Sequence, residues 1–146
     1  MLDCSRGAVY TVDMLRDYID KLSAMGYTML QLYAEDVYEI PDEPYFGYMR
    51  GKYTIEELRA LDSYAKSKGV EPIPCIQCLA HLGGITKWAE YANCTDTGDI
   101  LLADEPQTYL LIERMFSVCA QCFTSRRINI GMDEAHMVGL GKYLDR

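Results

Sequence analysis

The sequence predicts an α/β fold, and more specifically a partial (β/α)8 TIM barrel with parallel strands. Three observations lead to this prediction. Apolar segments rich in β-formers alternate with helical stripes, which implies parallel strands joined by right-handed crossovers. The first strand-to-helix turn lacks the glycine fingerprint of a dinucleotide-binding fold. Polar side chains gather directly after the predicted strands, and barrels have their active sites at that face. A doubly wound sheet also fits the element order, but the polar strand ends favour the barrel.

The amino-terminal half of the chain is expected to form two strands and two helices. A short first strand lies near residues 2–6, and a helical stripe over residues 12–25 follows. Residues 27–33 are nearly all apolar and indicate a buried strand. Thr54 and Glu57 stand three residues apart, as in a capping box, and predict the start of the second helix.

The second half repeats this pattern, with a long loop between its two strands. Residues 70–77 are a third strand candidate, weakened by two prolines that cannot donate to a ladder. A loop over 82–104, a helix from about 106 to 123 and a short strand over 128–132 follow. A complete barrel typically takes about 250 residues. We therefore expect residues 1–146 to be a single partial domain with roughly the first four βα units.

The composition limits the classes of partner. The net charge of −8 disfavours nucleic acid and anionic membranes, because both repel an acidic protein. No apolar run reaches the ~20 residues of a membrane span. The start of the chain lacks a signal peptide pattern, so a cytoplasmic location is expected. A neutral substrate such as a sugar remains compatible with this charge.

Six cysteines include two C-x-x-C pairs, Cys75–Cys78 and Cys119–Cys122. Two such pairs sometimes form a structural zinc site. Here the first pair lies on a predicted strand, where residues three apart face opposite sides, and the second lies within a helix. We therefore expect reduced core thiols, no bound metal and no other cofactor.

The acid pair Asp133-Glu134 follows the fourth predicted strand, directly after Gly131-Met132. Two like charges this close raise the pKa of one carboxyl, which can then donate a proton near neutral pH. A solvated loop is the ordinary alternative for such a pair. Three more polar candidates follow the other strands, namely Arg6, Asp36 and His81. An arginine fork can hold two sugar hydroxyls, and an aspartate can orient a histidine.

Taken together, these positions resemble the family 20 glycoside hydrolases. The family's Asp-x-x-Arg motif is matched by Asp3 and Arg6, and its paired acids after the second strand by Glu35-Asp36. Its remaining motifs are matched by Tyr64-Ala65, by His81 and by Gly131-Met132-Asp133-Glu134. The segments 44–51 and 130–136 look like a bacterial subgroup with a bare catalytic barrel. The chain departs from the common family form at Gln31, Leu79-Ala80 and Met132.

The resemblance implies an exo-acting β-N-acetylhexosaminidase that retains configuration by substrate-assisted catalysis, an exception to the two-carboxylate scheme. Glu134 would be the acid and base, and Asp133 would orient the substrate's 2-acetamido group. Arg6 and Glu35 would bind the substrate, and Asp36 and His81 would form a relay behind Glu134. The expected partner is an oligosaccharide with a terminal β-linked GlcNAc or GalNAc. The alternative is a non-catalytic half-barrel that binds carbohydrate weakly or not at all.

Overall fold

A computed structural model describes residues 1–145, in which three parallel strands form one sheet in the order β1-β2-β3. The strands are β1 (Leu2–Asp3), β2 (Met29–Tyr33) and β3 (Glu71–Cys75). β2 pairs with β1 on one side and with β3 on the other, with Tyr33 opposite both Asp3 and Cys75. Strands that follow the chain order, each joined to the next by a helix, are how a (β/α)8 barrel begins.

The three main helices begin where the sequence predicts. α1 (Val12–Ala24) is capped by Thr11, which accepts a hydrogen bond from the Met14 N–H. α2 (Ile55–Ser67) has the predicted capping box, with Thr54 N–H donating to Glu57 and Glu57 N–H donating back to Thr54. α4 (Pro106–Cys122) opens on a proline, whose missing N–H costs nothing in a first turn. These helix predictions are confirmed.

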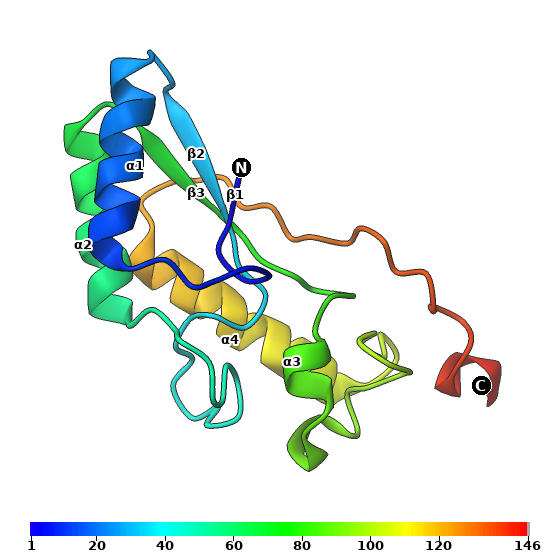
Figure 1. Ribbon diagram of the computed structural model, residues 1–146. Helices are drawn as coiled ribbons and strands as arrows, with labels where there is room; N and C mark the ends of the chain where they lie inside the picture. The colour runs from blue at the N-terminus through cyan, green and yellow to red at the C-terminus, as the bar shows by residue number, and fades with distance from the viewer. Residues whose placement is uncertain (146) are drawn as a thin grey trace.

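α1, α2 and α4 lie on one face of the sheet, with α2 in contact with both of the others (Figure 1). The core fills the space between these helices and the sheet. Side chains alternate along a strand, so Leu30 and Leu32 of β2 point into this core. Met29, Gln31 and Tyr33 point to the opposite face, where Met29 is exposed. That opposite face corresponds to the interior of a barrel.

The predicted fourth strand, residues 128–132, is reduced to a single parallel bridge between Cys75 and Asn129. Asn129 donates to the Pro74 carbonyl, and Ile76 donates back to Asn129. Alternation along β3 turns the nitrogens of Pro72 and Pro74 toward this same edge, where they have no hydrogen to donate. The pairing therefore starts only beyond the second proline, and the segment is too short to count as a strand.

The long loop over 82–104 contains two short helices, α3 (Gly83–Thr86) and η1 (Ala89–Tyr91). The chain then passes through α4 and the bridge, and η2 (Lys142–Asp145) packs on the loop through Tyr143. No helix within residues 1–145 combines the length and the apolar character needed to cross a membrane.

Candidate active site

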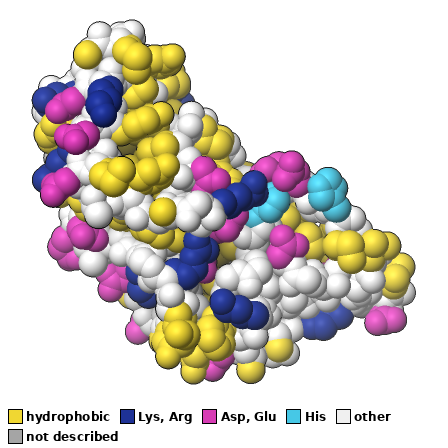
Figure 2. Space-filling model, in the orientation of Figure 1, with side chains coloured by type: hydrophobic (Ala, Val, Ile, Leu, Met, Phe, Trp, Pro, Cys, Tyr) yellow, Lys and Arg dark blue, Asp and Glu magenta, His cyan; other side chains and the backbone are white. Residues whose placement is uncertain are grey.

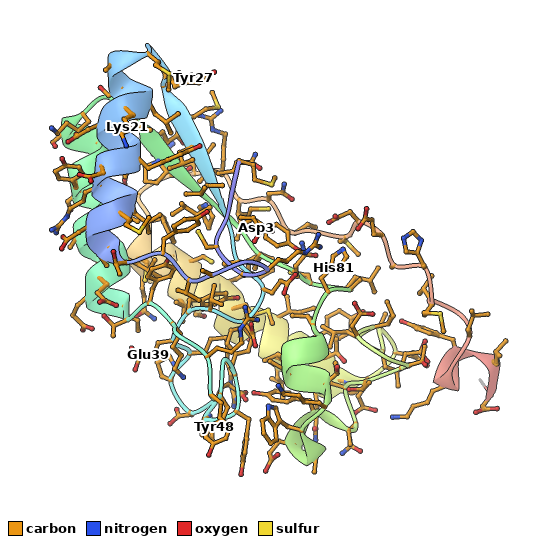
Figure 3. All side chains as sticks on the ribbon, viewed as in Figure 1. Asp3, Lys21, Tyr27, Glu39, Tyr48 and His81 are labelled. Atoms are coloured by element: carbon orange, nitrogen blue, oxygen red, sulfur yellow. The ribbon has the colours of Figure 1, made fainter. Side chains whose placement is uncertain are left out.

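The acid pair and His81 meet at the carboxyl end of β3. Cys78 N–H donates to the carbonyl of Ile130 at 3.0 Å, which places the segment of the acid pair beside the loop of His81. Nε2 of His81 lies 3.7 Å from a carboxylate oxygen of Asp133 and 3.5 Å from one of Glu134. Figure 3 shows His81 beyond the end of β3, and Figure 2 shows the histidines beside acidic side chains.

The exposure of these three side chains suits proton transfer. Both carboxylates are 59% exposed, whereas the His81 side chain is only 15% exposed and its Nε2 has no hydrogen-bond partner among the described residues. A buried ring nitrogen aimed at two accessible carboxylates can hold one of them or exchange a proton with it. The group that a substrate would meet first is therefore the acid pair, with the imidazole behind it.

Asp99 holds His81 from the other side. One Asp99 carboxylate oxygen accepts the His81 backbone N–H at 2.9 Å and lies 3.9 Å from Nδ1 of the ring. His81 has a positive φ of 59°, a conformation that ordinarily costs a non-glycine residue about 1–2 kcal/mol. The hydrogen bond that the His81 N–H donates to Asp99 helps to stabilise that conformation. Asp99 was missed at the level of sequence because it lies in an irregular loop, outside any motif.

Asp36 makes its ion pair with Arg50, and no ion pair joins it to His81 within residues 1–145. Its carboxylate pairs with the Arg50 guanidinium, which also donates to the carbonyl of Ser5. A Cβ at Gly84 would collide with the Asp36 carboxylate, so the loop after β3 packs directly on this group. Directly or through Arg50, Asp36 thereby contacts the loops that follow all three strands. Asp99 is a further carboxylate within 4 Å of the His81 ring, and the relay of Asp36 and His81 stays a prediction.

Removing Arg50 is expected to destabilise the fold in a pH-dependent way. Burial raises the pKa of Asp36 and the Arg50 charge opposes this, so Arg50→Met leaves a buried carboxylate without its partner. We expect the free energy of unfolding to fall by about 3 kcal/mol near pH 7. This is the lower end of the range for broken buried ion pairs, because Arg50 is partly exposed. A carboxyl whose pKa is raised on folding favours the folded state at low pH. The loss should therefore shrink as the pH falls toward about 4.

Denaturant unfolding of the complete protein at pH 7 and pH 4.5 tests this expectation. Arg127→Met is the matched control, because the ion pair between Arg127 and Glu71 lies at the surface. Such a pair contributes about 0–1 kcal/mol. Equal losses for the two variants at both pH values would contradict the role assigned to Asp36.

Arg6 and Glu35, the two predicted substrate-binding residues, lie together, and both form a hydrogen bond with Tyr33. Nε of Arg6 donates to Glu35 at 3.2 Å, and Nη2 donates to the Tyr33 hydroxyl at 3.0 Å. That hydroxyl donates to Glu35 at 2.9 Å. Burial and the bond to Glu35 raise the pKa of Tyr33, and Glu35 raises the pKa of Arg6. Tyr33 therefore stays neutral and Arg6 charged.

This arrangement leaves part of the Arg6 fork available. The Asp3 carboxylate accepts the backbone N–H groups of Ser5 and Arg6, which turns the chain at the end of β1. The Arg6 side chain is half exposed, and two of its five N–H donors are used by Tyr33 and Glu35. The remaining donors lie in one planar fork, which suits a ligand with two neighbouring oxygen acceptors.

The backbone around the acid pair adopts left-handed conformations at three positions. Gly131 has φ 54°, Glu134 has φ 53° and His81 has φ 59°. Glycine adopts this region freely, whereas the other two residues lose stability there. Outliers of this kind cluster at functional sites, so the backbone supports the same location as the side chains.

Three side chains of the site also have the composition of a metal site. Within residues 1–145, His81, Asp133 and Glu134 offer ligand atoms that all lie within 4.8 Å of one another. Two of these three groups are exposed acids, which are common at surfaces without an ion. The six cysteines are buried thiols, and burial raises the pKa of each, which disfavours the thiolate that zinc requires. The absence of a structural metal stays a prediction.

No protein-family model matches the chain, and no curated protein sequence matches it. Several solved structures, however, match the chain. The β-N-acetylhexosaminidase of Streptomyces coelicolor, a family 20 enzyme, superposes with a TM-score of 0.82 at 26% identity, over 93% of this chain and 32% of that chain. This is the fold of a family 20 glycoside hydrolase. The resemblance predicted from the motifs is therefore confirmed.

Other members of family 20 show the same match. The exo-β-N-acetylglucosaminidase of Vibrio harveyi, solved with N-acetylglucosamine, superposes with a TM-score of 0.85 over 97% of this chain and 28% of that chain. At 21% identity this match concerns the fold alone. A β-hexosaminidase of Streptomyces plicatus, solved with the product GlcNAc, matches at 26% identity. The chain spans about a third of the length of these structures and has the fold of that part of a family 20 enzyme.

Proposed function

We propose that this chain supplies the acid pair of a β-N-acetylhexosaminidase whose barrel is completed by further strands. The observation that carries the proposal is the approach of His81 Nε2 to both carboxylates of the acid pair, at the strand end of a family 20 fold. In this function the enzyme cleaves terminal β-linked GlcNAc or GalNAc with retention of configuration. The net charge of −8 agrees with a neutral substrate.

The proposed chemistry has two steps. In the first, Glu134 gives a proton to the glycosidic oxygen while the substrate's own acetamido oxygen attacks the anomeric carbon. Asp133 orients the acetamido group and stabilises the positive charge of the oxazolinium intermediate. In the second, Glu134 takes a proton from water, which opens the intermediate and releases the sugar with its original configuration.

The surrounding residues prepare this chemistry. Arg6 and Glu35 bind hydroxyls of the terminal sugar, with Tyr33 holding the two in one arrangement. His81, backed by Asp99, lies beside Glu134 and stabilises its ionised form after the proton has left. Asp36 maintains the loops but touches neither carboxylate of the pair in this structure.

The proposal is tested on a complete protein that contains this chain. Aryl N-acetyl-β-glucosaminide and its galacto epimer should both be hydrolysed, whereas the corresponding glucoside with a 2-hydroxyl should not. Progressive fluorination of the acetyl group should slow the reaction, because it makes the acetamido oxygen a poorer nucleophile. A rate that is independent of fluorination would exclude substrate assistance. If neither epimer is hydrolysed, the result favours the alternative, a non-catalytic half-barrel that binds carbohydrate weakly or not at all.

A further inference from the structure

Gln77 is a fully buried amide, and its side chain has no hydrogen-bond partner within residues 1–145. Its side chain is 1% exposed, and neither Nε2 nor Oε1 bonds to any described residue. Buried amides are nearly always hydrogen-bonded, since an unmet donor or acceptor costs stability. Packing alone does not explain a buried amide of this kind, because an apolar side chain would fill the same space at lower cost.

The amide lies beneath the turn that leads to the acid pair. The backbone of residues 76–78 pairs with residues 129–131. A Cβ at Gly131 would lie 2.6 Å from Nε2 of Gln77 and 2.7 Å from its Cδ, so the amide occupies the space that a side chain at 131 would take. Gly131 is therefore required both by its positive φ and by Gln77. Asp133 follows only two residues later.

Asp133 is a charged group close to this side of the strand, and its carboxylate accepts no hydrogen bond from the described residues. Cys75 and Gln77 point to the same side of β3 and its continuation, because side chains alternate. The pKa of the Cys75 thiol is raised by burial and then by the charge of Asp133, so that carboxylate acts on this side. Among residues 1–145 no hydrogen bond reaches the Asp133 carboxylate, and His81 Nε2 stays 3.7 Å away.

We propose that Gln77 is a positioning residue, whose Nε2 donates a hydrogen bond to the Asp133 carboxylate in the assembled barrel. The inference rests on the proposed function and deepens it. An amide can donate to a carboxylate but cannot take its proton under ordinary conditions. Gln77 would thus keep Asp133 ionised and oriented toward the acetamido group while Glu134 exchanges protons. A second carboxylate at position 77 would instead compete for the proton.

The test uses the complete enzyme with Gln77→Met, which keeps the length of the side chain and removes both polar atoms. We expect kcat to fall by about 10–10² fold with little change in KM, the effect of losing one hydrogen bond to a charged group. The acid limb of the pH–rate profile should move to higher pH, because the ionised Asp133 carboxylate loses a hydrogen-bond donor that stabilises it. Gln121→Met, on the exposed face of α4, is the control and should change neither quantity.

Gln77→Glu is the second variant and should move the acid limb further in the same direction, through like-charge repulsion. An unmoved acid limb in both variants, with only the melting temperature lowered, would show that Gln77 merely packs. A crystal structure of the complete enzyme with Nε2 more than 3.5 Å from the Asp133 carboxylate would overturn the proposal even if the variants fail to fold. If the wild-type enzyme hydrolyses no N-acetylhexosaminide, the proposed function fails as well, whereas an active enzyme with unmoved profiles refutes this inference alone.

Discussion

Replacing Glu134 with Gln in the complete enzyme is expected to slow the cleavage of poor leaving groups by about 10²–10⁴ fold, the usual contribution of general acid catalysis. Glutamine keeps the size of the side chain but has no proton to give to the glycosidic oxygen. Activated aryl glycosides should lose less, because their leaving groups need little protonation. Rates with alkyl and nitrophenyl N-acetylglucosaminides give the comparison directly.

The control is Glu113→Gln, an exposed acid on α4 far from His81 in the sequence and outside the site. It should leave both rates unchanged. Small and equal losses on the two substrate types for Glu134→Gln would remove Glu134 from the role of acid. The pH profile of the variant should also lose its basic limb, since that limb reports the protonated acid.

The 146 residues alone are expected to show no hexosaminidase activity and to self-associate. A hexosaminidase site would need groups from the later strands, and this chain spans only about a third of the matched structures. β1 and the segment after Arg127 leave unpaired edges, which can recruit strands from other chains. Large apolar side chains also remain exposed, among them Met29 on β2, Ile130 and Met132 beside the acid pair, and Leu110 and Phe116 on α4.

Light scattering and an activity assay on the isolated chain test this expectation. The complete protein, assayed at equal concentration, is the control and should be active. If the isolated chain is instead monomeric and turns over substrate, it completes its site without further strands. The proposal of a barrel shared with additional βα units would then be wrong.

The fold was predictable because its signals are local. Helix starts depend on capping residues within one turn, and Thr11, Thr54 and Glu57 are sufficient to place two of them. The order of parallel strands follows from the alternation of strands and helices. The extent of the fourth strand was not predictable in this way. It depends on the edge of β3 toward which the backbone nitrogens of Pro72 and Pro74 point. That edge is defined only by the pairing with β2.

The candidate site, like the fold, has one part that the sequence predicts and another that it does not. By itself the sequence determined that charged groups follow each strand, and hence that Arg6, Glu35, His81 and the acid pair come to one end of the sheet. Parallel strands end on the same edge, so this required no distances.

Only the tertiary structure decided which groups touch. Asp99 lies beside His81, Arg50 pairs with Asp36, and Gln77 lies against Gly131. These contacts join residues from irregular loops, where no periodicity relates sequence spacing to direction. A side chain there takes its position from what it packs against, and the packing exists only in the folded chain.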